Sequence, residues 1–275
     1  MTASSHPRPR RSVREVVWLV RRIAASVALL AAILAALALG FAGFGVREEM
    51  FDLDYAVGTL ATGWAPALAL LGMGLGAAAL VAGLLVPPRA DRVVSLLAIA
   101  LGACAHAGAT KVAALARSNP PIHDVATDWA DPLMLGAAAM AARGPDANPV
   151  SADARVQPQP QDPDLTGTPV SEVNVRTCRG ATPLILAVPP AAAFDRVRVV
   201  LAREGMSLTT ENAAAGRLEA VATMPWLNLK SDVVVRIRPE GPGARIDMRS
   251  IGRTGVADLG WNCRLITRLR RTMAR

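Results

Sequence analysis

Three residues of one short segment have side chains that can do acid–base chemistry: His123, Asp124 and Asp128. An imidazole close to a carboxylate is a common pair for general acid–base catalysis, for example in a hydrolase. The same residue types can instead brace a turn, because aspartate side chains accept hydrogen bonds from backbone amides and a histidine can stay neutral within a fold. A metal site needs three or four converging donors, and no further histidine lies near in sequence, so we expect no metal here. We favour the structural role for these residues and keep the hydrolase as the alternative.

A second candidate site is basic. Arginine grips phosphate and carboxylate groups in a bidentate manner, so an arginine-rich face can bind lipid phosphates or an acidic partner. Asp232, Glu219 and Asp247 are interleaved with these arginines, and an ordinary solvated face is therefore the alternative. The candidate binding residues lie on a predicted hairpin and a predicted final helix: Arg236, Arg238, Arg245, Arg249, Arg264, Arg268 and Arg271.

The remaining motifs exclude several chemistries. We find no Gly-x-Ser-x-Gly elbow and no glycine-rich phosphate loop ahead of a helix, so we expect no cofactor and no nucleotide. Cys178 and Cys263 can pair in an oxidising compartment, although Cys263 can equally be a small core residue. Both alternatives stay open from the sequence alone.

The elements that position these residues begin with a membrane anchor. The chain of 275 residues is 52% hydrophobic, which is too apolar for an ordinary soluble protein. Three apolar stretches predict membrane-spanning helices at about 23–46, 60–86 and 93–116. A cleaved signal peptide is the alternative for the first stretch, but this stretch is longer than the apolar region of about 7 to 15 residues that a signal peptide has. Within the third, we expect a neutral His106 bonded inside the bundle and a Lys111 that extends to the interface.

The flanking charges predict the orientation of this anchor. Residues 1–22 form a basic tail that carries six arginines: Arg8, Arg10, Arg11, Arg14, Arg21 and Arg22. The loop at 87–92 is also basic, whereas the loop at 47–59 carries four acidic residues. Because positive loops stay in the cytoplasm, we expect a cytoplasmic N-terminus and an extracytoplasmic 118–275. In a bacterium this places the chain in the inner membrane, with the C-terminal part in the periplasm.

The C-terminal part reads as an α+β domain with an antiparallel sheet of about four strands and packed helices. Asp131 suits the N-cap of a short helix at 133–142, and six prolines predict a loop or linker at 143–169. Alternating apolar residues then predict strands, and apolar residues at helical spacing predict helices. The predicted strands are 206–210, 217–223, 232–238 and 244–250, and the predicted helices are 191–204 and 256–273.

Several of these blocks also resemble a known family. The stretch Asn119–Asp128, the strand Gly216–Ala220, the run Ser231–Ile237, and Arg245–Ser250 followed by Gly255–Gly260 are similar to the domain-of-unknown-function 1499 family. The resemblance covers roughly residues 118–273. It implies a bacterial protein whose domain follows membrane spans. It supplies no catalytic residue, because the family has no established reaction.

Together these features predict a non-catalytic integral membrane protein. Its extracytoplasmic domain would bind a partner protein of the envelope or an amphiphile at the membrane surface. We expect membrane lipids among its partners and no nucleic acid, because the arginine bias is first a topology signal. A transporter is disfavoured, since the spans lack paired charges at mid-depth.

Overall fold

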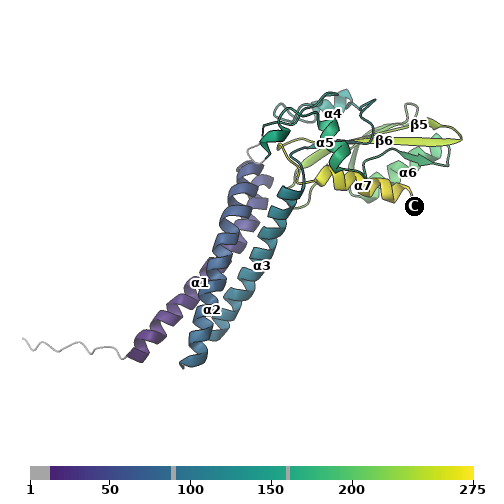
Figure 1. Cartoon of the computed structure of the whole chain (residues 1–275). Coiled ribbons are helices and arrows are strands. Elements are labelled where there is room, and N and C mark those ends of the chain that lie inside the picture. Colours follow the sequence, from purple (N-terminus) through teal and green to yellow (C-terminus); the bar gives the residue numbers. More distant parts are fainter. Residues whose placement is uncertain (1–12, 88–90, 159–161) are drawn as a thin grey trace, which may run out of the picture. The chain divides into compact units, whose positions relative to one another are not determined.

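The chain folds into two units in the computed structural model (Figure 1). The first comprises residues up to Gly45 together with Asp54–Ala113, and the second comprises Val46–Leu53 together with Ala114–Arg275. The structure describes residues 13–87, 91–158 and 162–275. Arg8, Arg10, Arg11 and Arg89, on which the predicted orientation partly depends, lie outside the described residues.

The first unit contains three helices that are long and apolar enough to cross a membrane. They are α1 (Val13–Arg47), the continuous helix formed by the π-helical η1 (Tyr55–Trp64) and α2 (Ala65–Leu85), and α3 (Asp91–Ser118). Each predicted span lies within one of these helices, except that the second continues one residue past Leu85. The helices extend beyond the apolar stretches, so α1 already includes Arg14, Arg21 and Arg22.

Small residues let these helices approach closely. Ala35, Ala69 and Ala105 contribute one buried cluster, with one alanine from each helix. A Cβ atom added to Gly72 would lie 2.9 Å from the carbonyl oxygen of Ala28, so the backbones of α1 and α2 nearly touch there. Such contacts are the usual source of helix association in lipid, where apolar surface gains nothing from burial against another helix.

A buried ion pair joins α1 to α3. Arg21 donates to the Asp91 carboxylate at 3.1 Å, and both side chains are largely buried. Arg21 also donates to the carbonyl of Val86, at the end of α2. Arg21 therefore lies within a helix and links all three helices of the first unit.

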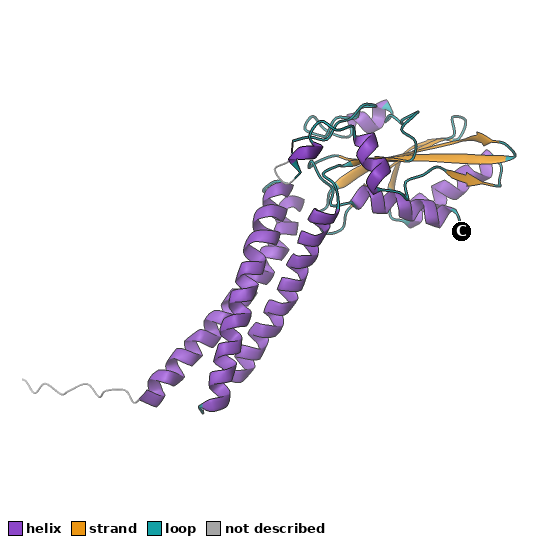
Figure 2. Cartoon of the chain, in the orientation of Figure 1, coloured by secondary structure: helices purple, strands orange, loops and turns teal. Residues whose placement is uncertain are grey.

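The second unit is built on an antiparallel sheet of six strands (Figure 2). The strand order is β1-β6-β5-β4-β3, and β2 pairs with the other end of β6. The strands are β1 (Asp124–Ala126), β2 (Leu184–Leu186), β3 (Ser207–Asn212), β4 (Arg217–Thr223), β5 (Lys230–Glu240) and β6 (Gly243–Gly252). The α+β class and the antiparallel sheet are confirmed, with two three-residue strands added along β6.

Helices cover one face of this sheet. Residues of α5 (Val170–Thr177), α6 (Pro190–Arg203) and α7 (Trp261–Met273) share a core with the inward residues of β5 and β6. The opposite face, which we call the outer face, is covered by loops and by the short α4 (Ala137–Ala141). Leu133, Leu135 and Ala139 pack there against Val234 and Ile251. The outer face is therefore interior to the domain over much of its area.

The predicted helix at 133–142 is wrong in its start and its cap. The helix α4 begins only at Ala137, and Asp131 accepts a hydrogen bond from Arg236 instead of capping it. The backbone just before α4 is hydrogen-bonded to side chains of the sheet. Arg249 donates to the Leu133 carbonyl, and the amide of Gly136 donates to Glu219. These bonds hold the chain extended where local sequence preference favours a helix.

The ends of two further predicted elements also differ. The helix predicted from residue 256 begins at Trp261, because Gly260 adopts a left-handed φ of 73° and Asp258 accepts hydrogen bonds from the amides of Gly260 and Asn262. The stretch 143–169 is a loop over most of its described length, with one 3-10 turn at Pro163–Leu165. It is bound to the domain, since Val156 lies in the core.

Candidate functional site

His123 is buried immediately before β1 and braces two segments. Its Nδ1 lies 3.1 Å from the carbonyl oxygen of Val256, to which a protonated Nδ1 donates. Burial lowers the pKa of His123 despite this hydrogen bond and the nearby Asp124 carboxylate, so the imidazole is neutral at neutral pH. Its own carbonyl accepts hydrogen bonds from Gly252 and from the Asn262 side chain. These contacts fasten β1 to the segment that leads into α7.

Asp124 is engaged by a buried arginine. Both of its carboxylate oxygens accept hydrogen bonds from Arg249, at 2.9 and 2.6 Å, and neither side chain is more than 1% exposed. Arg249 also donates to the carbonyls of Leu133 and Ser151, and its guanidinium lies over the Trp129 ring. The pair is part of the covered outer face, so Arg249 contributes to no accessible surface.

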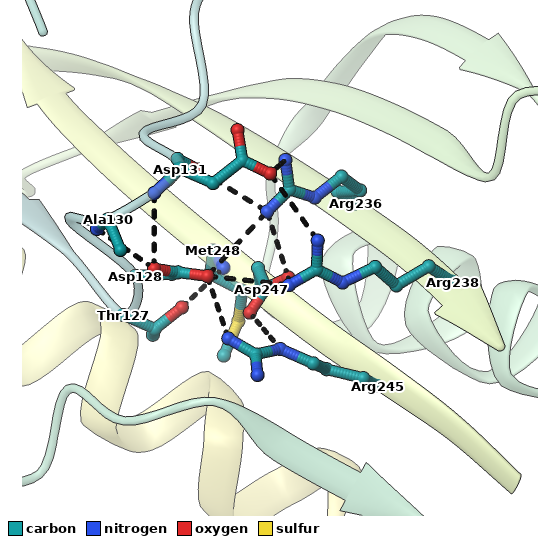
Figure 3. Close-up of polar contacts among 9 residues, drawn as sticks. All are labelled: Thr127, Asp128, Ala130, Asp131, Arg236, Arg238, Arg245, Asp247 and Met248. Carbon is teal, nitrogen blue, oxygen red and sulfur yellow. Dashed lines mark hydrogen bonds and ion pairs between the residues drawn. The ribbon is translucent and has the colours of Figure 1, made fainter. Parts of the chain in front are cut away.

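Asp128 belongs to a separate cluster (Figure 3). Thr127 exchanges two hydrogen bonds with Met248, which continues the pairing of β1 with β6 and positions the residue that follows. One Asp128 oxygen accepts from the amides of Ala130 and Asp131, and the other accepts from Arg245 at 2.7 Å. His123, Asp124 and Asp128 therefore have different partners, and their functional groups do not converge. Among the described residues, no three His, Cys, Asp or Glu side chains gather as for a metal ion.

Three arginines and three aspartates form this second cluster, which we call the Asp–Arg cluster. Across β5 and β6, Arg236 lies opposite Asp247 and Arg238 lies opposite Arg245. Asp247 is fully buried and contacts all three arginines at 2.9 to 3.2 Å, and its carboxylate raises the pKa of Arg245. The members are Arg236, Arg238, Arg245, Asp128, Asp131 and Asp247. Because positive and negative charges are equal in number, the cluster has little net attraction for an anion.

Further ion pairs of the outer face involve arginines that the sequence analysis did not single out. Arg143 and Arg253 both pair with the buried Asp232. Arg217 pairs with the buried Glu219. Arg217 and Glu219 are two residues apart on β4 and therefore lie on the same face, so their spacing could have predicted this ion pair. Nothing near Arg143 in sequence indicates its partner, which lies 89 residues away.

The arginines of α7 are different, because they are exposed. Arg264, Arg268 and Arg271 all lie on the solvent side of the helix. Arg268 pairs with Glu204 at 2.8 Å and lies near the Trp261 ring. Arg264 and Arg271 donate to backbone carbonyls of Leu259 and Thr267, and within the described chain they pair with no carboxylate. Of the seven candidate binding arginines, these three are exposed, Arg249 is buried, and the other three are partly exposed but paired with carboxylates.

The remaining residues considered in the sequence analysis are two cysteines of the domain and two polar residues of α3. A disulfide joins Cys178 to Cys263 across 85 residues and ties the end of α5 to α7. In α3, Lys111 is exposed. His106 is half-buried, and its Nδ1 is buried without a hydrogen-bond partner in the described structure, which differs from the bonded histidine we expected.

Comparison with known families agrees with these observations. The sequence model of one family, described as "Protein of unknown function (DUF1499)", matches residues 124–273. The match begins at β1 and ends at the last residue of α7, so it includes the whole sheet and the helices that cover it. No curated protein matches the chain. Since the match covers more than half of the sequence, the chain belongs to the DUF1499 family.

Proposed function

We propose that this protein is a membrane-anchored, non-catalytic binding protein whose DUF1499 domain engages anionic amphiphiles at a membrane surface. The domain acts through the exposed arginines Arg264, Arg268 and Arg271, which we call the α7 arginines. The hydrolase alternative loses its support, because the imidazole and both carboxylates that it requires bond to structural partners.

The observation that carries the proposal is the charge of α7. The helix contains four arginines and no acidic residue between Trp261 and Met273, and its apolar side, with Leu265, Ile266 and Leu269, is buried in the core. Its charged side is therefore exposed, and only Arg268 on it pairs with a carboxylate in the described chain. Each basic residue near an anionic lipid surface contributes about 1 kcal/mol, and a membrane tether raises the chance of such contacts.

We further propose that the domain lies outside the cytoplasm of a bacterium, with the N-terminal segment inside. The distribution of basic residues supports this orientation. The Cys178–Cys263 disulfide supports it independently, because structural disulfides persist mainly in oxidising compartments.

A vesicle flotation assay tests the binding. The full chain is placed in nanodiscs of neutral phosphatidylcholine and mixed with vesicles that contain or lack anionic phosphatidylglycerol. We expect flotation with anionic vesicles only, and weaker flotation at high salt, since surface charges are screened beyond about 8 Å at physiological ionic strength. Arg264→Gln, Arg268→Gln and Arg271→Gln together should remove most of the binding.

A matched control separates this surface from total charge. Arg155→Gln, Arg176→Gln and Arg179→Gln remove three exposed arginines from other parts of the same domain. This control should float like the unaltered protein. Equal loss in both triple variants, or equal flotation with neutral vesicles, would show that the α7 arginines are an ordinary solvated face.

A further inference from the structure

A groove lies between α6 and α7, on the side of these helices away from the sheet core. Its volume is about 580 Å³, within the range of about 300 to 1,000 Å³ that is usual for small-molecule sites. Its lining comes from residues 195–203 of α6, from the last turn of α7 and from the residue that ends the chain: Asp195, Arg196, Val199, Val200, Arg203, Thr272 and Arg275. We call it the α6–α7 groove.

The side chains that line this groove carry a net positive charge, and two of the three arginines are unpaired in the described chain. Arg203 and Arg275 are exposed, and within the described chain neither forms a hydrogen bond or an ion pair. Arg196 donates one weak hydrogen bond of 3.3 Å to the Met273 carbonyl. The one carboxylate of the lining, Asp195, lies 4.0 Å from Arg198, which is not part of the groove. The side chains of the lining therefore include three guanidinium groups and one carboxylate.

Helix dipoles account for only part of this arrangement, because they favour arginines near a helix C-terminus but do not attract an anion. Both α6 and α7 end at the groove, and a helix C-terminus carries about half a negative charge. An anion in the groove would be held by guanidinium groups and not by backbone amides. Arginines at these positions could serve only to satisfy the last carbonyls, but Arg203 and Arg275 make no such bond in the described structure.

The groove also offers apolar surface. Val199 is 39% exposed, and its neighbour Val200 closes the floor. Thr272 directs its hydroxyl to Glu204 and to the carbonyl of Arg268, so it adds no free polar group. A ligand that combines a multiply charged anionic head with short aliphatic carbons matches this lining, because arginine forks bind phosphate oxygens in pairs.

We propose that the α6–α7 groove binds the phosphate headgroup of an anionic amphiphile. Arg196, Arg203 and Arg275 contact the phosphate oxygens, and Val199 contacts the carbons next to the phosphate. This inference deepens the proposed function: the α7 arginines attract an anionic surface, and the groove holds one lipid of that surface. The inference rests on the proposed function only in its choice of an anionic amphiphile as the class of ligand.

Calorimetric titration of the full chain in phosphatidylcholine nanodiscs tests the groove. The titrants are dihexanoyl phosphatidic acid, dihexanoyl phosphatidylcholine and inorganic phosphate. The acidic lipid should bind at one site per chain, inorganic phosphate more weakly, and the zwitterionic lipid not measurably. Arg203→Gln with Arg275→Gln should weaken the acidic lipid about tenfold or more, because two charge-assisted contacts are lost.

The control removes the same charge from outside the groove. Arg264→Gln with Arg271→Gln should leave this affinity within about twofold while it reduces vesicle flotation. Equal weakening in both variants would overturn the groove and leave the surface proposal intact. Inorganic phosphate or the zwitterionic lipid binding as tightly as phosphatidic acid would also overturn it. A loss of vesicle flotation without a loss of phosphatidic acid affinity tests the α7 arginines and leaves the groove proposal intact.

Discussion

At the scale of single residues, the domain buries charge to an unusual extent for its size. Arg249 and Asp124 are both almost fully buried, as are Asp232 and Asp247. Desolvating such groups is costly, and their mutual attraction repays this only where the geometry is good and the remaining donors are satisfied. Arg249 meets that condition, because each of its three nitrogens donates to an oxygen. The pair thus fixes the position of residues 131–151, which cover the outer face and which we call the covering segment.

The Arg249–Asp124 pair gives a first prediction. Arg249→Met should lower the free energy of unfolding by about 3 to 5 kcal/mol, because it leaves a buried carboxylate without a partner. Arg238→Met is the control, since Arg238 is 35% exposed and its acidic partners keep other arginines. It should cost about 1 kcal/mol or less. Pulse proteolysis in urea on the full chain in neutral detergent measures both; equal losses would contradict the structural role of the pair.

Asp258 gives a pH-dependent prediction. Burial raises its pKa to about 6, although amide hydrogen bonds from Asn262 and Gly260 favour the ionised form. An unfolded aspartate titrates near 3.9, so the folded state binds the proton more tightly. Stability from this group is therefore fully present below about pH 4 and is lost as the pH rises through about 6.

The comparison of the unaltered protein with Asp258→Ala isolates this effect. As the pH falls from 8 to 4, the difference between their free energies of unfolding should change by about 3 kcal/mol in favour of the unaltered protein. His123 contributes with the opposite sign, since its lowered pKa makes stability fall in acid, but it is present in both proteins and cancels. A difference independent of pH would mean that Asp258 stays ionised in the fold.

Single residues also show where sequence reasoning stops. The alternation of β5 and β6 correctly separates the core residues Val233, Val235 and Ile237 from the arginines. It cannot show what lies on the other side of the sheet. The covering segment reaches that face through contacts such as Arg143 with Asp232, which are distant in sequence and leave no periodic pattern. Four of the seven arginines predicted as a binding face therefore pair with carboxylates of the outer face, and one of them, Arg249, is fully buried.

At the scale of elements, the long, strongly periodic ones were predictable. The three long apolar helices, α6 and the strands β3 to β6 follow from hydrophobic runs, alternation and glycine-containing turns. The elements missed are short: β1, β2 and α5. Their existence depends on tertiary contacts. The Asn174 side chain of α5, for example, accepts hydrogen bonds from the Ala126 amide and from the Trp129 indole.

The packing of α2 provides an element-scale prediction. Gly72→Leu should disrupt the contact of α2 with α1, because even a Cβ atom would lie within about 3 Å of the backbone at Ala28 and Ala32. Gly74→Leu is the matched control on the same helix, since nothing lies within 4 Å of a Cβ at Gly74. Thermal stability of the full chain in detergent, followed by size-exclusion chromatography, should fall for the first variant only. A similar fall for both would argue against close packing at Gly72.

At the scale of the whole molecule, a hydrophobic anchor is joined to a domain that contains most of the charged groups. Three helices long enough to span a membrane precede the DUF1499 domain, and three crossings would place the two ends of the chain on opposite sides, as the proposed orientation requires. The proposed function requires the residues after Arg117 to lie outside the cytoplasm, where the disulfide can persist and an outer lipid surface is available.

The most direct measurement uses a reporter that fluoresces only in the cytoplasm. Fused after Arg275 of the full chain in bacterial cells, the reporter should be dark, because the domain would be exported. As a control, fusion after Pro87, in the loop predicted to be cytoplasmic, should be bright at equal protein levels. A bright fusion after Arg275 would contradict the orientation, the oxidising surroundings of Cys178 and Cys263, and the proposed binding at an extracytoplasmic surface.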